Sequence, residues 1–306
     1  MKKVIIRIGV PIVAILLLIS VVPASAYFKA NSTNGEIVSS GQNRRYLLYV
    51  PKTYNPANPT PLIISMHGFA GWPAHQMDVS KWDALADEYG FIVVYPAGRG
   101  LPMYWRTGGL SGNDTDMMKD VTFISDLIDT LQAEYNIDPA RIYANGFSNG
   151  GGMSFVLACK LADRIAAVGI VSGTYLLPWN ECNPSRPVPL IDFHGTADPV
   201  IPYEGELPKV LNISSPAIPE WIDELSRRNG CNDQPLELPA IQDVRGIQYT
   251  NCTANAEVVL YTVVGGGHSW PGVKAMIEQI AGHTTMAIDA TRVMWEFFQT
   301  HPMTGK

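Results

Sequence analysis

Short apolar runs rich in branched and aromatic residues alternate along this chain with longer segments in which apolar residues recur every three or four positions. The runs lie at 46–50, 62–66, 91–95, 142–144, 167–171, 188–193 and 258–264. Runs of this length and composition predict β-strands. Because most of them are almost continuously apolar, they predict strands that are buried on both faces of a mostly parallel sheet.

The segments between the runs predict helices. Residues 82–89 end at Gly90, a residue that commonly closes a helix, and residues 120–135 and 284–298 carry apolar side chains on one face. Strands that alternate with amphipathic helices predict an α/β fold, a three-layer sandwich with helices on both faces of the sheet. Residues 27–306 contain no internal repeat and no linker composition, so we expect a single domain.

The first 26 residues have the pattern of a signal peptide. Basic residues at Lys2, Lys3 and Arg7 precede an apolar run, and the small residues Ala24 and Ala26 flank Ser25. A membrane anchor is the alternative, but the run is shorter than the roughly 20 residues that a spanning helix needs. We therefore expect cleavage after Ala26 and a secreted, extracellular product without a stable membrane anchor.

The charge of the chain argues against a nucleic-acid partner. Lysine and arginine number 22 and aspartate and glutamate 28, a formal net charge of −6, which becomes −9 without the three basic residues of the leader. No basic cluster follows the leader, so we expect no nucleic-acid binding. The chain also has no metal or cofactor motif, and its sequence leaves the oligomeric state open.

Four cysteines follow the leader, at Cys159, Cys182, Cys231 and Cys252. An even number in an exported chain predicts two disulfides, which could be connected in three ways. Pairing of sequence neighbours would close two loops of similar length, each worth about 3 kcal/mol in chain entropy. A zinc site is the alternative, but no CxxC or histidine-rich spacing supports it.

The motif Gly146-Phe147-Ser148-Asn149-Gly150 lies between a predicted strand and a helix-compatible segment at 153–158. G-x-S-x-G in this setting predicts a nucleophile elbow, in which a sharp turn exposes the serine. An ordinary glycine-rich turn is the alternative interpretation. We predict that Ser148 is a nucleophile.

A serine nucleophile needs a base and a carboxylate that orients the base. Among six histidines, His268 stands in a glycine-rich loop directly after the last predicted strand, where open α/β sheets bind ligands. Asp198 lies in the loop after the preceding predicted strand, whereas the competing Asp192 lies within that strand. The order Ser148, Asp198, His268 matches the order of α/β-hydrolases.

The tetrahedral intermediate of such a hydrolase needs two oriented N–H donors for its oxyanion. We predict the backbone N–H of Asn149, directly after the nucleophile, as one donor. The second donor is predicted to be the backbone N–H of Phe69, in the glycine-containing turn after the strand at 62–66. His67 is interpreted as a structural support for this turn.

These motifs together resemble a known family. The resemblance rests on His67-Gly68, Gly146-Phe147-Ser148-Asn149-Gly150-Gly151, residues 158–168, His194-Gly195-Thr196-Ala197-Asp198 and Gly266-Gly267-His268-Ser269-Trp270-Pro271-Gly272. They are similar to the secreted polyhydroxybutyrate-depolymerase-like esterases, a group that includes bacterial feruloyl esterases of carbohydrate esterase family 1. The resemblance spans nearly the whole mature chain.

The resemblance implies an α/β-hydrolase fold, carboxylic ester hydrolysis and no cofactor. It also implies Ser148 as nucleophile, His268 as base and Asp198 as its orienting partner. Phe69 stands where the family often has cysteine or threonine. The stretch 114–120 is similar to an aspartate-rich family segment, and we expect it to cap a helix and support a loop.

The loops around the predicted site indicate the kind of ester. Only 50 positions separate Ser148 from Asp198, which leaves little room for a lid, and an open site suits bulky or polymeric substrates. Trp72, Trp105 and Trp270 lie in the same loops and are predicted to bind substrate by stacking.

The leading hypothesis is a secreted feruloyl esterase that acts through an acyl-enzyme on hydroxycinnamoyl esters of plant polysaccharides such as xylan. A polyhydroxyalkanoate depolymerase is the alternative. A non-catalytic binding protein on a hydrolase scaffold is an alternative of another class.

Overall fold

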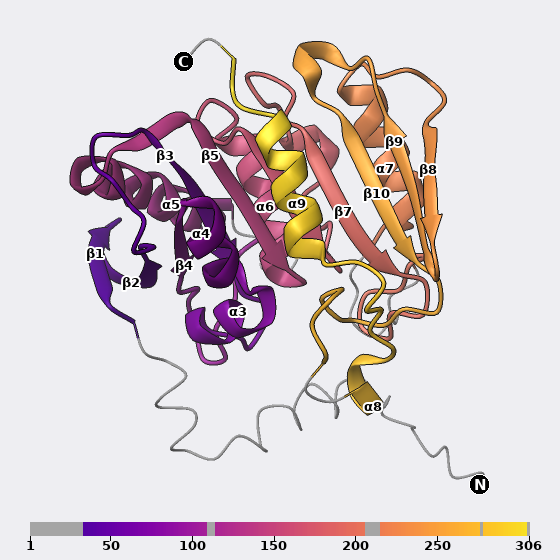
Figure 1. Cartoon of the computed structure of the whole chain (residues 1–306), viewed down its shortest axis with the longest axis horizontal. Coiled ribbons are helices and arrows are strands. Elements are labelled where there is room, and N and C mark those ends of the chain that lie inside the picture. The colour runs from indigo at the N-terminus through magenta and orange to yellow at the C-terminus, as the bar shows by residue number, and fades with distance from the viewer. Residues whose placement is uncertain (1–32, 109–113, 206–214, 276–277, 305–306) are drawn as a thin grey trace, which may run out of the picture.

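The computed structural model describes residues 33–108, 114–205, 215–275 and 278–304 (Figure 1). The predicted signal peptide lies outside the described residues. The strands are β1 (Gly35–Ser39), β2 (Gln42–Tyr49), β3 (Thr60–Met66), β4 (Ile92–Pro96), β5 (Ile137–Phe147), β6 (Ala167–Val171), β7 (Leu190–Gly195), β8 (Leu236–Ile241), β9 (Val244–Tyr249) and β10 (Val258–Val263). The helices are α3 (Pro73–Ser80), α4 (Trp82–Tyr89), α5 (Asp114–Glu134), α6 (Asn149–Lys160), α7 (Ile218–Arg228), α8 (Glu278–Ala281) and α9 (Ala290–Thr300), with short 3₁₀ turns η1 (Trp179–Glu181) and η3 (Thr253–Asn255).

The strands form one ten-stranded sheet in the order β1-β2-β4-β3-β5-β6-β7-β10-β9-β8. The central strands from β4 to β10 run parallel, and the pairs at both edges are antiparallel. Every strand predicted from an apolar run is present. The sheet is therefore mostly parallel, as predicted.

Helices cover both faces of the sheet, which makes the three-layer sandwich that the pattern predicts (Figure 1). On one face, α5, α6 and α7 contribute residues such as Phe123, Phe155 and Trp221 to a buried core. On the other face, α4 and α9 contribute Trp82 and Phe298 to a second core. No helix within the described segments is long and apolar enough to cross a membrane.

Two disulfides connect the cysteines that are neighbours in the sequence. Cys159, near the end of α6, is bonded to Cys182 after η1, and Cys231 after α7 is bonded to Cys252. All four cysteines are thereby used, which excludes the zinc-site alternative for them. The connectivity that the sequence left open is resolved as nearest-neighbour pairing.

The structure contains elements that the sequence pattern does not predict, namely β1, β8 and β9 at the edges of the sheet and the helices α3, α7 and α8. Strand β8 is almost wholly exposed and lacks a continuous apolar run. The last helix begins at Ala290, later than the predicted 284, because the carboxylate of Asp289 accepts hydrogen bonds from Thr291 N–H and Arg292 N–H and caps it there.

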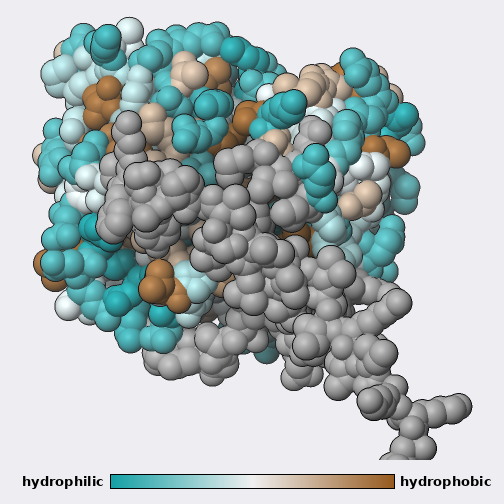
Figure 2. All heavy atoms as spheres, turned by 90° about the horizontal axis from the view of Figure 1, so that it is seen from below, coloured by the Kyte–Doolittle hydropathy of each residue, from teal (hydrophilic) through white to brown (hydrophobic). Residues whose placement is uncertain are grey.

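The strand registers determine which loops meet at the carboxyl edge of the sheet, the lower edge in Figure 1. Met66 pairs with Gly146, so the turn after β3 lies beside the turn after β5. Gly195 pairs with Val263, so the loops after β7 and β10 are also neighbours. Figure 2 views this edge from below, and its coloured surface is mostly hydrophilic with separate apolar groups.

Candidate active site

Ser148 occupies a strained turn between β5 and α6. Its φ of 56° and ψ of −119° lie outside the regions that L-residues usually adopt, a conformation that costs on the order of 1–3 kcal/mol. A side-chain carbon at Gly146 would collide with the backbone of Gly150, and one at Gly150 would collide with the carbonyl of Met66. The glycines therefore allow the elbow geometry that the motif predicts.

Asp198 and His268 are hydrogen-bonded to each other at this edge. The Nδ1–H of His268 donates to Oδ2 of Asp198 over 2.8 Å. Oδ1 of Asp198 accepts from the backbone N–H groups of Val200 and Ile201, each at 2.8 Å. The carboxylate is thus fixed by three donors, and it leaves Nε2 of the imidazole available for a proton.

The environment keeps Asp198 ionised. Burial alone would raise the pKa of this carboxyl, but the charge and hydrogen bond of His268, with the Ile201 N–H, hold the pKa below its usual value. The ring of Phe147, the residue before Ser148, lies 4.8 Å from the His268 ring between centroids. The Asp198–His268 pair therefore lies against the residue that precedes Ser148, although the three segments are distant in the sequence.

His194 is a second histidine beside the same carboxylate. Its Nε2 lies 3.6 Å from Oδ2 of Asp198 and donates to the carbonyl of Ile201 over 2.9 Å. Burial lowers the pKa of His194, so the ring is kept neutral. Its spacing of four positions from Asp198 is the signal that could have indicated this support of the Asp198 loop.

The competing carboxylate, Asp192, faces the interior of the sheet. It is fully buried in β7, between Ile170 of β6 and Leu260 of β10 in the sheet register. Burial raises its pKa to about 7, although the Tyr175 hydroxyl and the Phe193 N–H oppose the rise. The carboxylate that is bonded to His268 is Asp198 and not Asp192.

The predicted oxyanion donors both lie beside Ser148. A side-chain carbon at Gly68 would be 3.3 Å from Cβ of Ser148, so the turn that contains Phe69 passes directly over the serine. Asn149 is the first residue of α6. Within the described part of the chain, neither the Phe69 N–H nor the Asn149 N–H has a hydrogen-bond acceptor. Two such N–H groups can stabilise a developing oxyanion.

The prediction that Trp105 and Trp270 contact substrate is wrong. Trp105 is fully buried and donates its indole N–H to the carbonyl of His67, and Trp270 is 2% exposed and donates to the hydroxyl of Thr291. Both rings are enclosed by the core, so neither presents a face to a bound molecule. Trp72 is half-buried and lies 5.3 Å from the ring of His75, and its role as a substrate contact stays a prediction.

Exposed aromatic surface at the site comes instead from Phe69 and Tyr104. Phe69 is 46% exposed, and its ring centroid lies 6.2 Å from that of Tyr104. The sequence pattern predicts a role only for the backbone of Phe69 and none for Tyr104. No group of three or more His, Cys, Asp or Glu side chains in the described segments is arranged to hold a metal ion.

Comparison with known proteins assigns this chain to a family. The Phospholipase/Carboxylesterase family model matches residues 53–208. Feruloyl esterase B of Piromyces equi is 32% identical over 234 residues, which cover 74% of this chain and 42% of that protein. Feruloyl esterase C of Emericella nidulans is 28% identical over 273 residues, which cover 87% of each chain.

The solved structures agree in fold. The acetyl xylan esterase from Aspergillus awamori superposes with a TM-score of 0.59 at 16% identity, over 87% of this chain and 98% of that one. At this identity the likeness shows the α/β-hydrolase fold alone. The present chain spans less than half of the Piromyces enzyme but most of the other two proteins. The family match, covering about half of the chain, and the esterase relatives together show that this chain belongs to the phospholipase/carboxylesterase family of α/β-hydrolases.

Proposed function

We propose that this protein is a secreted serine carboxylesterase of the feruloyl esterase type, which releases hydroxycinnamic acids from esters of plant polysaccharides. The observation that carries the proposal is the strained Ser148 beside the hydrogen-bonded pair Asp198–His268. Strain of this kind persists only where the surrounding structure enforces it, and it is concentrated at functional sites. A binding protein would have no use for it, which disfavours the non-catalytic alternative.

In the proposed mechanism, Oγ of Ser148 attacks the ester carbonyl while Nε2 of His268 takes its proton. Asp198 holds the imidazole in the required tautomer and stabilises the imidazolium through the 2.8 Å hydrogen bond. The oxyanion receives the N–H groups of Phe69 and Asn149. The protonated His268 then gives its proton to the leaving alcohol, and an acyl-enzyme forms on Ser148.

Water completes the reaction. His268 removes a proton from a water molecule, the resulting hydroxide attacks the acyl carbon, and the second tetrahedral intermediate uses the same two N–H donors. Its collapse returns the proton to Ser148 and releases the carboxylic acid. Apart from the ester and this water molecule, these steps use only side chains and backbone groups of the described site.

The feruloyl preference is supported by the relatives and by the surface next to the nucleophile. Two of the relatives are named feruloyl esterases. The exposed ring of Phe69 and the nearby Tyr104 offer apolar and aromatic surface to a cinnamoyl ring. Residues 149–197, all of which are described, form α6, β6, η1 and β7 with their connections and contain no inserted lid. The absence of an inserted lid between these two positions suits a polymeric, cell-wall-derived ester.

Two further features support secretion. The disulfides Cys159–Cys182 and Cys231–Cys252 are typical of oxidising compartments. The leader pattern of residues 1–26 gives the route of export.

A substrate panel on the purified protein tests the proposal. Release of ferulate from methyl ferulate is compared with clearing of polyhydroxybutyrate granules, and Ser148→Ala is the matched control in both assays. We expect ferulate release by the wild type and none by Ser148→Ala. Granule clearing without ferulate release would favour the depolymerase alternative, and absence of all ester hydrolysis would favour the binding-protein alternative.

A further inference from the structure

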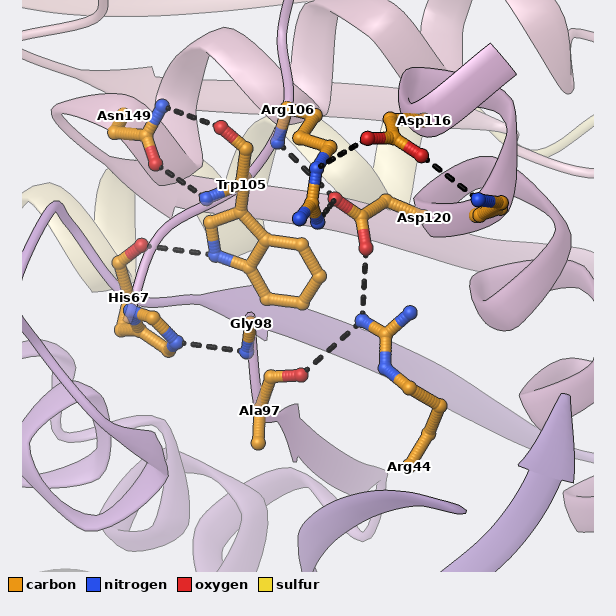
Figure 3. A network of polar contacts seen from close by, with 10 residues as sticks. Arg44, His67, Ala97, Gly98, Trp105, Arg106, Asp116, Asp120 and Asn149 are labelled. Carbon is orange, nitrogen blue, oxygen red and sulfur yellow. Dashed lines mark hydrogen bonds and ion pairs between the residues drawn. The ribbon is translucent and has the colours of Figure 1, made fainter. Parts of the chain in front are cut away.

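The two predicted oxyanion donors come from separate elements. Trp105, in the loop 97–106 after β4, is hydrogen-bonded to His67 of the first element and to Asn149 of the second (Figure 3). Phe69 belongs to the turn after β3, whereas Asn149 begins α6. Stabilisation of an oxyanion depends on the relative position of the donors, because both must point at one oxygen atom. The contacts of this loop therefore bear directly on the proposed catalysis.

On the α6 side, the side chain of Asn149 holds the backbone of Trp105 at two points. Oδ1 of Asn149 accepts from the N–H of Trp105 over 2.6 Å, and Nδ2 donates to the carbonyl of Trp105 over 3.0 Å. The residue is 4% exposed. The chemistry of an oxyanion hole needs only the main-chain N–H of this residue, so the paired side-chain bonds require a separate explanation.

On the β3 side, the same loop holds the turn that carries Phe69. The indole N–H of Trp105 donates to the carbonyl of His67 over 3.0 Å, and the N–H of Ala70 donates to the carbonyl of Met103 over 2.8 Å. The residues on both sides of the Gly68–Phe69 pair are thus tied to the loop. Trp105 contacts the elements of both donors at once.

His67 adds a bond of defined direction. The N–H of Gly98 donates to Nε2 of His67 over 2.9 Å, so Nδ1 carries the proton and donates to the carbonyl of Gly68 over 2.7 Å. Burial lowers the pKa of His67 to about 4, which keeps the ring neutral at ordinary pH. The neutral ring links the loop to the residue directly before Phe69.

Buried charges anchor the loop near its two ends. The carboxylate of Asp120 in α5, which is fully buried, accepts from the N–H of Arg106 over 3.1 Å and forms an ion pair of 2.9 Å with Arg44 of β2. Arg44 also donates to the carbonyl of Ala97 over 3.3 Å. The loop is therefore bonded to β2 at position 97 and to α5 at position 106. Residues between these two positions contact both the turn that carries Phe69 and the start of α6.

We propose that the loop 97–106 acts as a clamp that sets the distance between the two oxyanion donors, with the side chains of Asn149 and Trp105 as its positioning residues. The proposal rests on the esterase function above. Because the donors act on the charge that develops in the transition state, loosening the clamp lowers kcat and leaves KM nearly unchanged.

The primary test is Asn149→Ala, with Asn229→Ala as its control. Asn149→Ala retains the backbone N–H and removes both bonds to Trp105. Asn229, after α7, is equally buried at 4% exposure, and its amide bridges the carbonyls of Val188 and Ala256 at 3.3 and 2.9 Å. The two substitutions thus remove similar buried bonds, one at the clamp and one away from the proposed site.

We expect Asn149→Ala to lower kcat for p-nitrophenyl acetate about 100-fold, the scale that a small misplacement of catalytic groups produces. KM should stay within about twofold, since substrate binding does not use the displaced donors. Inhibition by phenylboronic acid, whose tetrahedral adduct uses the oxyanion donors, should weaken by the same factor as kcat. Asn229→Ala should change none of these quantities, and unfolding curves give the folded fraction of each variant.

Trp105→Phe is the second variant, because it removes the indole bond to His67 and keeps most of the buried ring. Its control is Trp82→Phe in α4, which loses a buried indole bond of 3.0 Å to Asn145. A kcat that is lower in Trp105→Phe but unchanged in Trp82→Phe supports the clamp. If Asn149→Ala does not fold, the comparison of these two variants tests the proposal in its place.

Two results separate the clamp from the function on which it rests. An active wild type whose kcat and boronate affinity survive in Asn149→Ala and Trp105→Phe, or decline equally in the control variants, overturns the clamp and leaves the esterase function intact. A wild type that hydrolyses no ester overturns both proposals.

Discussion

Replacement of Asp198 by asparagine tests the proposed triad through the tautomer of His268. The asparagine can occupy the same space in two orientations. In one orientation its oxygen replaces Oδ1 and keeps the bonds from the N–H groups of Val200 and Ile201, both 2.8 Å long in the wild type. Its NH₂ group then faces Nδ1 of His268 and donates to it.

The other orientation is disfavoured by the same geometry. It would aim the NH₂ group at two backbone N–H donors, which would lose two buried hydrogen bonds at a cost of about 1–3 kcal/mol each. The first orientation therefore prevails and forces the proton of His268 onto Nε2. In this tautomer Nε2 cannot accept the proton of Ser148, and we expect kcat to decrease about 10⁴-fold, or about 5.5 kcal/mol in activation free energy.

The assay is the kcat of Asp198→Asn for p-nitrophenyl acetate, with folding checked by circular dichroism. Asp192→Asn is the matched control, because Asp192 is a buried carboxyl in β7, the strand that precedes the Asp198 loop, and the carboxylate bonded to His268 is Asp198. We expect the control to keep wild-type kcat. A nearly active Asp198→Asn, or an Asp192→Asn as impaired as predicted for Asp198→Asn, would refute the reasoning.

Three further predictions concern stability and specificity. The folded-state pKa of Asp192 is raised to about 7, above an unfolded value near 3.9, so the wild type loses stability as pH rises from about 4 to 7. The free energy of unfolding in urea should decrease less over this pH range in Asp192→Asn, and an equal decrease in both proteins would contradict this prediction. Phe69→Ala should lower kcat/KM for methyl ferulate about tenfold more than for p-nitrophenyl acetate, because an aromatic contact contributes about 0.5–1.5 kcal/mol beyond the area that it buries; an unchanged ratio would remove Phe69 from the substrate surface. Replacing Cys159 and Cys182 together by alanine should lower the free energy of unfolding by about 3 kcal/mol, because the unfolded chain regains the conformational entropy of a loop whose ends are 23 positions apart. Urea denaturation measures this change, and undiminished stability would contradict the prediction.

The sequence predicted the centre of the fold well because burial there leaves a strong pattern. The apolar runs of β3, β4 and β6 are enclosed on both faces, and each is visible as a continuous run. The edge strand β8 is held mainly by backbone bonds to β9 and exposes most of its side chains, so no continuous apolar run marks it.

The strained turn at Ser148 and the pairing of Asp198 with His268 were also predictable, since the glycines around Ser148 and the chain order of Asp198 and His268 are features of the sequence itself. The burial of Trp105 and Trp270 was not predictable in the same way. An aromatic residue in a loop carries no sign of whether its ring faces solvent or core. Here the buried partners that decide it, His67 and Thr291, come from distant segments of the chain.

The hydrogen bonds of the clamp could not be predicted from the sequence either. Asn149 and Trp105 are 44 positions apart, and their paired bonds depend on β4 and β5 flanking β3 on its two sides. The aspartate-rich stretch 114–120 was expected to support a loop, and Asp120 does so through Arg44 and Arg106. The identity of those partners became visible only when the strands were placed in order.

The central claim is that Ser148 carries the acyl group during ester hydrolysis. Its most direct test is labelling with diisopropyl fluorophosphate, followed by peptide mapping in a mass spectrometer and by parallel measurement of ester hydrolysis. We predict a single adduct on Ser148 that forms in proportion to the loss of activity, and neither adduct nor activity in Ser148→Ala. An adduct on another residue, or ester hydrolysis that survives in Ser148→Ala, would contradict the account.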